Sequence, residues 1–210
     1  RTFVSIGDQY TLINRYASVS SSFSRGNYVR SKHIKLAQRA ELFNGLYGEI
    51  KLEYAIKSPL VGLDFANWSM DVFGELNDPE EFTEYTKSEI RLQLTWIPIQ
   101  KYYYKGQRKI SLGSDFPTVN MIYRKGIPGL FNSEVDFDFI EIGANDEIKI
   151  PQLGTSKWNI QIGSFLNKNN LRLIEWKYFR GSDPVFFSNP LSSFQLLGPT
   201  LSTPNEFLRA

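Results

Sequence analysis

Few side chains in this sequence have the types and spacing that catalysis requires. His33 is the only histidine, so a Ser-His-Asp triad would have to use it. It follows the basic run Arg30-Ser31-Lys32 at the start of an expected strand, and no serine lies in a Gly-x-Ser-x-Gly elbow. We therefore interpret His33 as a structural or surface residue, and we predict no catalytic residue and no enzymatic activity.

Carboxylates are the next candidates, either as calcium ligands or as the acids of a glycosidase. The acidic stretch from Asp78 to Glu84 offers oxygen ligands, but its spacing matches no calcium-binding loop, so a solvated loop is the simpler interpretation. Asp136 and Asp138 lie about 7 Å apart on one face of an expected strand, which suits a glycosidase, although a polar lumen explains them more simply. The sequence contains no cysteine, which excludes thiolate metal sites. We expect neither a metal nor a cofactor.

Composition limits the class of protein. The 210 residues carry 24 Lys+Arg against 22 Asp+Glu, and this net charge of +2 gives no support for a nucleic-acid partner. A hydrophobic share of 41% is too high for a disordered chain, yet no apolar run approaches the roughly 18 residues of a transmembrane helix. The run Tyr102-Tyr103-Tyr104 between two lysines could stack nucleic acid or sugar, but an aromatic girdle at the end of a barrel strand is the better interpretation.

Apolar and polar residues alternate along several segments, and this period of two is typical of β-strands. Clear alternation predicts strands over residues 34–42, 49–57, 89–96, 135–139 and 158–163, and a weaker pattern predicts them over 10–23, 109–112, 118–123 and 171–179. Asn44-Gly45 and Gly106-Gln107 are typical of hairpin turns. The chain is therefore predicted to be all-β, a meander of long antiparallel hairpins.

Longer connections and the two termini complete the organisation. Residues 57–84 and 181–205 are long connections, and the second is rich in proline and serine. The chain begins without Met and ends as a strand begins. We therefore interpret residues 1–210 as one partial outer-membrane β-barrel domain, truncated at both ends.

Three features favour a membrane barrel over a soluble β-sandwich, which shows the same alternation. The strands are long, near the roughly 9–11 residues that cross a bilayer with tilt. The polar faces carry dense charges of both signs, which a wet lumen tolerates. Aromatic residues lie near strand ends, at Trp96, Trp158 and the segment Trp176–Phe179, as an interfacial belt requires.

Four segments of the chain also resemble a known family. They are ELFNGLYG at 41–48, LGSDFPT at 112–118, YRKGIPGLF at 123–131 and WKYFRGSDP at 176–184. Together they are similar to the outer-membrane barrel of a Gram-negative family of uncharacterised proteins, whose full-length members carry an N-terminal carboxypeptidase-regulatory-like domain. That barrel resembles the BamA/TamA-like, or bacterial surface-antigen, superfamily of assembly and translocation proteins.

The resemblance implies a closed antiparallel barrel of roughly 16 strands in the cell outer membrane, of which this chain holds a part. In the superfamily, a long extracellular loop with an Arg-Gly motif folds into the lumen, where the arginine pairs with inward residues. Arg180 and Gly181 match that motif, so the resemblance implies them as binding residues of a lumen-inserted loop. A guanidinium fork can tie a loop to acidic side chains on the wall, and glycine permits a sharp turn. Ser182 departs from the pattern, where an aromatic residue is usual.

The function implied by the resemblance is non-enzymatic envelope biogenesis, the assembly or translocation of proteins or lipids. Its partners would be the outer-membrane bilayer and client outer-membrane proteins or lipids; the oligomeric state is left open. A passive channel, a surface-anchor barrel and a soluble β-sandwich that binds a ligand are the alternatives. If one face contacts lipid, Arg at Leu52 or Leu92 should block folding in lipid, whereas Arg at Glu53 or Gln93 should be far milder.

Overall fold

The structure is a computed structural model that describes residues 2–5, 11–12, 28–59, 82–152, 154–179 and 202–210. It confirms the all-β prediction. The elements in chain order are β1 (Thr2–Ser5), β2 (Thr11–Leu12), β3 (Tyr28–Phe43), β4 (Leu46–Ser58), β5 (Tyr85–Trp96), β6 (Lys101–Lys105), β7 (Arg108–Gly113), β8 (Thr118–Gly126), the 3-10 turn η2 (Leu130–Asn132), β9 (Asp136–Ile150), β10 (Gly154–Asn170), the 3-10 turn η3 (Leu173–Glu175), β11 (Lys177–Tyr178), β12 (Ser202–Thr203) and β13 (Phe207–Arg209).

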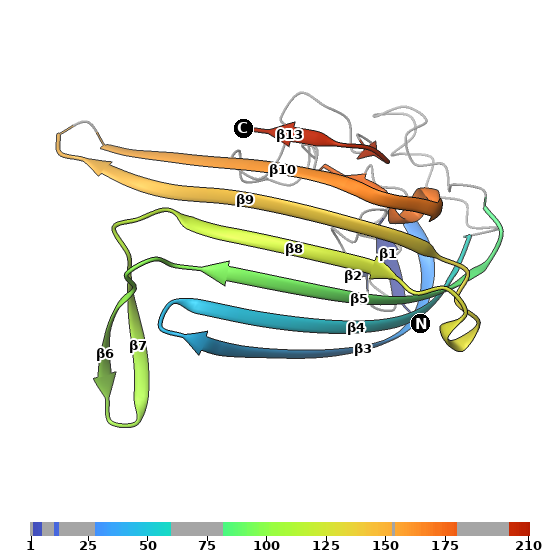
Figure 1. Cartoon of the computed structure of the whole chain (residues 1–210), viewed down its shortest axis with the longest axis horizontal. Coiled ribbons are helices and arrows are strands. Elements are labelled where there is room, and N and C mark those ends of the chain that lie inside the picture. Colours follow the sequence, from blue (N-terminus) through green and yellow to red (C-terminus); the bar gives the residue numbers. More distant parts are fainter. Residues whose placement is uncertain (1, 6–10, 13–27, 60–81, 153, 180–201) are drawn as a thin grey trace.

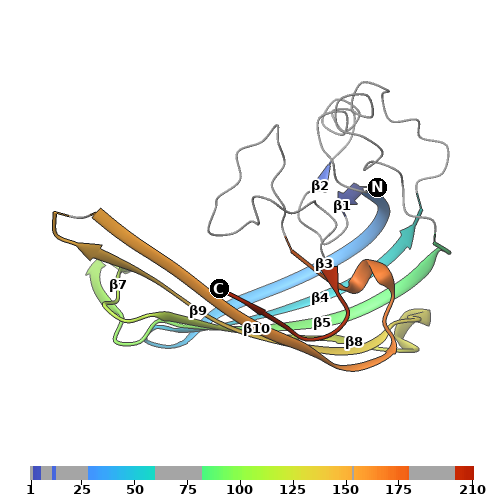
Figure 2. The same cartoon turned by 90° about the horizontal axis from the view of Figure 1, so that it is seen from above.

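One large antiparallel sheet dominates the molecule. Its nine strands follow the order β13-β10-β9-β8-β5-β4-β3-β1-β2, so β3, β4, β5, β8, β9 and β10 form a meander (Figure 1). β3, β4, β5, β9 and β10 are 12 to 17 residues long, which confirms the prediction of long strands. The sheet is curved, and η3 lies on its concave side (Figure 2). Within the described residues it is open, with edges at β13 and β2, rather than closed into a barrel.

Residues of like character face each other across neighbouring strands. Leu36 pairs with Leu52 and Ile50 pairs with Leu92, while the intervening Lys35 pairs with Glu53. Because successive side chains on a strand point to opposite faces, this register gathers the aliphatic residues on the convex face and the charged residues on the concave face. No helix within the described residues is long and apolar enough to cross a membrane.

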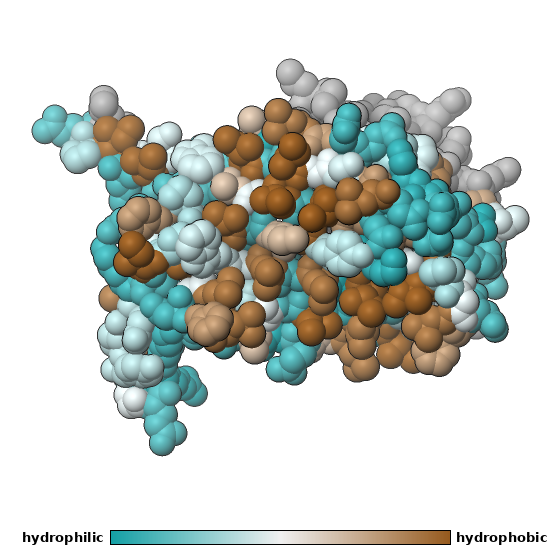
Figure 3. All heavy atoms as spheres, viewed as in Figure 1, coloured by the Kyte–Doolittle hydropathy of each residue, from teal (hydrophilic) through white to brown (hydrophobic). Residues whose placement is uncertain are grey.

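The convex face exposes many large apolar side chains. Ile34 is 67% exposed, Leu36 64%, Ile162 56% and Leu208 73%. Figure 3 shows apolar side chains spread over the central strands of this face. Other large apolar residues exposed on the same face include Leu42, Ile50, Leu52, Leu92, Leu94, Trp96, Met121, Ile142 and Ile160. An apolar surface that spans six strands is far larger than the isolated exposed residues of an ordinary soluble protein.

The buried hydrophobic core lies on the concave side, at one end of the sheet. The Phe139 ring lies 4.7 Å from that of Phe165, centroid to centroid, and the Phe137 ring lies 6.1 Å from it. Val29, Tyr85, Val135 and Ile174 complete this core. Phe207 of β13 packs against it and lies 5.0 Å from Phe179. The core therefore joins strands from both halves of the meander to the segment that follows β10.

Two sequence-based predictions are wrong in this architecture. Residues 171–179 were expected to form a strand, but they form η3 and the two-residue β11, because Ile174, Glu175 and Phe179 turn inward and are buried. The three tyrosines 102–104 lie on β6, which pairs only with β7 in a separate hairpin that projects from the end of the large sheet (Figure 1). They are therefore not at the end of a strand of that sheet. Of the expected strand 10–23, only Thr11–Leu12 falls within the described residues.

The β3–β4 turn provides a first test of this architecture. Gly45 has a φ of +82°, and a Cβ added there would lie 2.2 Å from the Ile97 carbonyl oxygen. Gly45→Ala should therefore cost more than about 2 kcal/mol of unfolding free energy, because the left-handed backbone alone costs about 1–2 kcal/mol. Urea titration of the protein refolded in detergent micelles measures this loss.

Gly106 of the β6–β7 turn is the matched control. Its φ is +62°, but a Cβ there would meet no atom within 4 Å. Gly106→Ala should therefore carry only the backbone cost of about 1 kcal/mol. Equal losses at the two glycines would show that the β3–β4 turn does not approach Ile97 as closely as described.

Candidate functional site: a charged cavity on the concave face

Four charged side chains from three adjacent strands meet on the concave face. They are Glu53 of β4, Lys87 and Glu89 of β5, and Arg124 of β8. The alternation turns them inward because their neighbours Leu52 and Ile90 occupy the convex face. Glu53 and Glu89 are direct cross-strand partners, and like charges in that position destabilise a sheet unless cations lie between them.

Lys87 supplies the first of these cations and is only 1% exposed. Its Nζ lies 2.8 Å from Glu175 Oε2, 3.0 Å from Glu89 Oε2 and 3.4 Å from Glu53 Oε2. An ammonium has three hydrogens to donate, so one lysine can satisfy three carboxylates at once. The buried lysine thus stabilises three acidic residues that come from β4, β5 and η3.

Arg124 supplies the second cation and donates two hydrogen bonds to Glu89. Its Nε donates to Glu89 Oε1 over 3.0 Å, and its Nη2 donates to Glu89 Oε2 over 2.9 Å. The same Nη2 lies 3.3 Å from Glu175 Oε2. Bidentate guanidinium–carboxylate pairs of this kind are among the strongest hydrogen-bonded contacts in proteins.

Glu175 brings a distant part of the chain into this network. It belongs to η3, is 3% exposed, and accepts a hydrogen bond from the Tyr85 hydroxyl over 2.9 Å in addition to those from Lys87 and Arg124. All of its contacts here come from strands of the large sheet. Glu175 therefore fastens the segment that follows β10 onto the concave face.

A second ion pair fastens the same segment two residues later. Lys177 of β11 donates a hydrogen bond to Glu141 of β9. Burial lowers the pKa of the Lys177 ammonium, and the adjacent Glu141 carboxylate opposes that shift. Removal of either partner would leave the other as a buried unpaired charge, which is costly.

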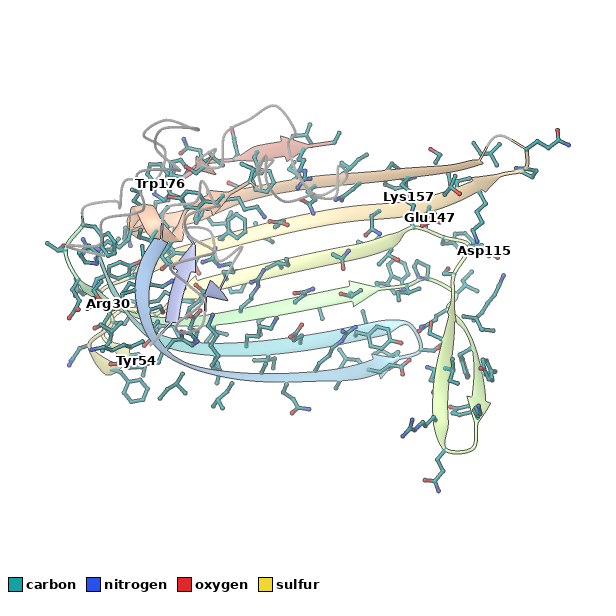
Figure 4. The ribbon with its side chains drawn as sticks, turned by 180° about the vertical axis from the view of Figure 1, so that it is seen from behind. Arg30, Tyr54, Asp115, Glu147, Lys157 and Trp176 are labelled. Atoms are coloured by element: carbon teal, nitrogen blue, oxygen red, sulfur yellow. The ribbon has the colours of Figure 1, made fainter. Side chains whose placement is uncertain are left out.

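A cavity of about 410 Å³ lies between this segment and the sheet. Trp176 lies beside it, at the end of the concave face that carries η3 (Figure 4). The cavity is lined by five basic and four acidic residues: Lys35, Lys51, Arg91, Arg124 and Lys177, with Glu53, Glu89, Glu141 and Glu175. Phe139, Ile174 and Tyr178 add apolar walls. A concave site with apolar walls and a few convergent charges has the character of a ligand site.

The structure places the sequence-predicted residues unevenly around this cavity. Arg180 and Gly181 lie outside the described residues, so the loop motif stays a prediction. His33 lies on β3, where its Nδ1 is 3.3 Å from Ser31 Oγ. Trp176, expected in an interfacial belt, instead lines the cavity, because Glu175 and Lys177 on either side of it are held against the sheet.

The predicted placement of Asp136 and Asp138 in a lumen is wrong. Asp138 is in register with Lys125, on the same face as the convex Ile140 and Ile142, whereas Phe137 and Phe139 point to the concave core. On the convex face the Asp138 carboxylate accepts hydrogen bonds from Lys125 Nζ at 2.9 Å and from the Tyr123 hydroxyl. The apolar residues of β9 point to the concave side up to Phe139 and to the convex side from Ile140 onward. The polar residues that alternate with Phe137 and Phe139 therefore lie on the convex face.

Sequence reasoning missed the residues that hold the cavity together. Lys87 lies two residues before the expected strand 89–96 and continues its alternation, so extending that strand would have found it. Arg124 lies one residue beyond the expected strand 118–123, by the same reasoning. Glu175 carries no local signal, because its partners are 51 to 90 residues away in sequence.

Metal binding has no support from the part of the chain that the structure describes. No group of three or more His, Cys, Asp or Glu side chains there could hold an ion. The cavity lining instead mixes both signs of charge, and most of these side chains form ion pairs.

Fold and site define an all-β protein with a large curved antiparallel sheet, apolar on its convex face and charged on its concave face. The chain belongs to a family of unknown function, DUF5686, whose C-terminal domain matches residues 2–210. No curated protein and no solved structure matched the chain. The resemblance to the BamA/TamA-like superfamily thus remains a prediction.

Proposed function

We propose that this chain forms part of the wall of an outer-membrane β-barrel, with its convex face against lipid and its concave face lining a water-filled lumen. The observation that carries the proposal is the contrast between the two faces. The convex face exposes aliphatic and aromatic side chains across six strands, whereas the concave face holds Lys87, Glu89 and Arg124 in ion pairs. Transmembrane barrels alternate in this way, apolar outward and polar inward.

A soluble sandwich would cover the apolar face with a second sheet. Within the described residues no element packs on the convex face, where Ile34 and Ile162 remain 67% and 56% exposed. Burial of a Leu or Ile side chain is worth about 1.5–3 kcal/mol, so a face of this size strongly favours an apolar environment. Hydrocarbon supplies that environment without a second layer of protein.

Strand lengths and connections agree with a spanning wall. β3, β4, β5, β9 and β10 exceed the roughly 9–11 residues that cross a bilayer with tilt. At one end of the sheet the β3–β4 and β9–β10 turns are short, although the β5–β8 connection there carries the β6–β7 hairpin. At the other end the connections 59–84 and 171–206 are long in sequence. Outer-membrane barrels have short periplasmic turns and longer extracellular loops, which would direct η3 to the extracellular side.

The cellular role that best fits this architecture is non-enzymatic envelope biogenesis, the assembly or translocation of proteins or lipids. The bilayer would be the first partner, and client outer-membrane proteins or lipids would be the others. The support is the family resemblance of the four sequence segments, together with a concave surface built from ion pairs rather than from a catalytic constellation.

Fractionation of the cells that produce the protein tests the location. The protein should remain in the outer-membrane fraction after a carbonate wash, and the purified chain should fold in phosphatidylcholine vesicles, with the strands protected from protease. Folding as a stable monomer in aqueous buffer without detergent would overturn the proposal, because the convex face would then tolerate water.

Deletion of the gene tests the role. An envelope-assembly defect, seen as reduced levels of other outer-membrane proteins or of surface lipid, is the expected result. Measurable ion conductance in planar bilayers without any assembly defect would instead identify a passive channel.

A further inference from the structure

Three cations lie side by side across the concave face. Lys51 of β4 is the direct cross-strand partner of Arg91 of β5, and Arg91 is the direct partner of Arg124 of β8. All three line the cavity beneath η3. Like charges in direct register repel, so this row requires negative charge to be placed against it.

Two members of the row have that negative charge within the chain. Lys51 Nζ lies 2.9 Å from Glu49 Oε1, and Arg124 grips Glu89 with two hydrogen bonds. Lys177, on the opposite wall of the cavity, pairs with Glu141. The carboxylates of Glu49, Glu89 and Glu141 are therefore already engaged.

Arg91 is the exception. Within the described residues it forms no ion pair, and its Nε is buried without a hydrogen-bond partner. A guanidinium does not deprotonate in proteins, so burial cannot be relieved by loss of its charge. Arg91 is partly buried, and a charge withdrawn from water is costly unless it is paired. The cavity lining as a whole also has one more basic residue than acidic residues.

We propose that the cavity binds a phosphate group against Arg91. A guanidinium presents a planar fork of donors that matches the oxygens of phosphate, and Lys51 and Arg124 on either side add favourable potential. The cavity volume of about 410 Å³ exceeds what phosphate alone requires, so the ligand carries a further group against Trp176 and Tyr178. A lipid headgroup and a free phosphate compound share this chemistry. The site does not depend on the convex face touching lipid, so it goes beyond the proposed function.

Calorimetric titration of the full chain, refolded in a nonionic detergent, tests the proposal with two probes. One is inorganic phosphate and the other is dihexanoyl phosphatidylglycerol, each added at constant ionic strength set with sodium chloride. Saturable binding is expected, and Arg91→Gln should weaken it at least tenfold. Tighter binding of the lipid would identify a headgroup as the source, and comparable binding of both probes would identify free phosphate.

Arg39→Gln is the matched control. Arg39 lies on β3, outside the cavity lining, with its guanidinium 5.2 Å from the Tyr47 ring centroid, so its loss should leave phosphate binding unchanged. A second readout separates ligand recognition from a structural role. Without phosphate, Arg91→Gln should unfold at the same urea concentration as the native chain or at a higher one, since it removes an unpaired cation.

Three outcomes would overturn the proposal. One is the absence of saturable binding of both probes, and another is equal binding by the Arg91→Gln and native chains. The third is a lower unfolding midpoint for Arg91→Gln in phosphate-free buffer, which would show that Arg91 already has a stabilising partner within the chain.

Discussion

Replacement of Leu92 by Arg should prevent stable insertion of the chain into phosphatidylcholine vesicles. Leu92 lies in the middle of β5, is 40% exposed on the convex face, and is flanked across the sheet by Ile50 and Tyr123. An arginine facing the bilayer midplane costs about 2–4 kcal/mol in a transmembrane barrel. The measurement is urea unfolding of the vesicle-inserted protein, followed by tryptophan fluorescence.

Gln93→Arg is the control, one residue along the same strand. Gln93 faces the concave side, where water and other charges receive a guanidinium, so its substitution should be nearly neutral. Glu53→Arg, which the alternation alone suggested as an equally mild change, is not a suitable control because Glu53 pairs with Lys87 and Lys35. Equal tolerance of Arg at residues 92 and 93 would contradict a lipid-facing convex surface.

Lys87→Met should destabilise the protein more than any substitution on the surface. The change leaves the carboxylates of Glu53, Glu89 and Glu175 without the ammonium that lies 2.8 to 3.4 Å from each. Breaking a buried ion pair by removal of one partner costs about 3–5 kcal/mol. Urea titration in detergent micelles should record a loss of this size.

Lys157→Met is the control, because it removes one partner of an ion pair that is exposed rather than buried. Lys157 Nζ lies 2.7 Å from Glu147 Oε2, but both side chains are nearly half exposed, at the end of the sheet away from Trp176 (Figure 4). Exposed pairs contribute about 0–1 kcal/mol. If the two lysine substitutions have similar effects, the network around Lys87 is not the buried anchor described above.

Alternation along the sequence predicts the strands of the large sheet well, because burial of one face imposes the same period of two on each. The segments 34–42, 49–57 and 89–96 lie within β3, β4 and β5, and Asn44-Gly45 forms the turn between β3 and β4. The convex apolar residues and the concave charges of these strands follow directly from that period.

The candidate site was less predictable, because its contacts link residues far apart in sequence. Glu175 is buried by Tyr85, Lys87 and Arg124, and no local pattern distinguishes it from an exposed acid. β9 misleads for another reason, since its apolar residues change from the concave to the convex face between Phe139 and Ile140. When the apolar residues of a strand change face, the segment remains hydrophobic, but its apolar side chains point to the opposite side of the sheet.

The outer edge of β10 has a further consequence for the proposed barrel. β10 runs from Gly154 to Asn170, yet it pairs with β13 only at Gln161, Ile162 and Gly163. Within the described residues, the amide and carbonyl groups on that side of residues 154–160 have no strand beside them. Hydrocarbon offers no hydrogen bonds, and each unsatisfied backbone group there costs several kcal/mol. In a membrane, another strand would therefore have to pair with this edge of β10, and the barrel would close there.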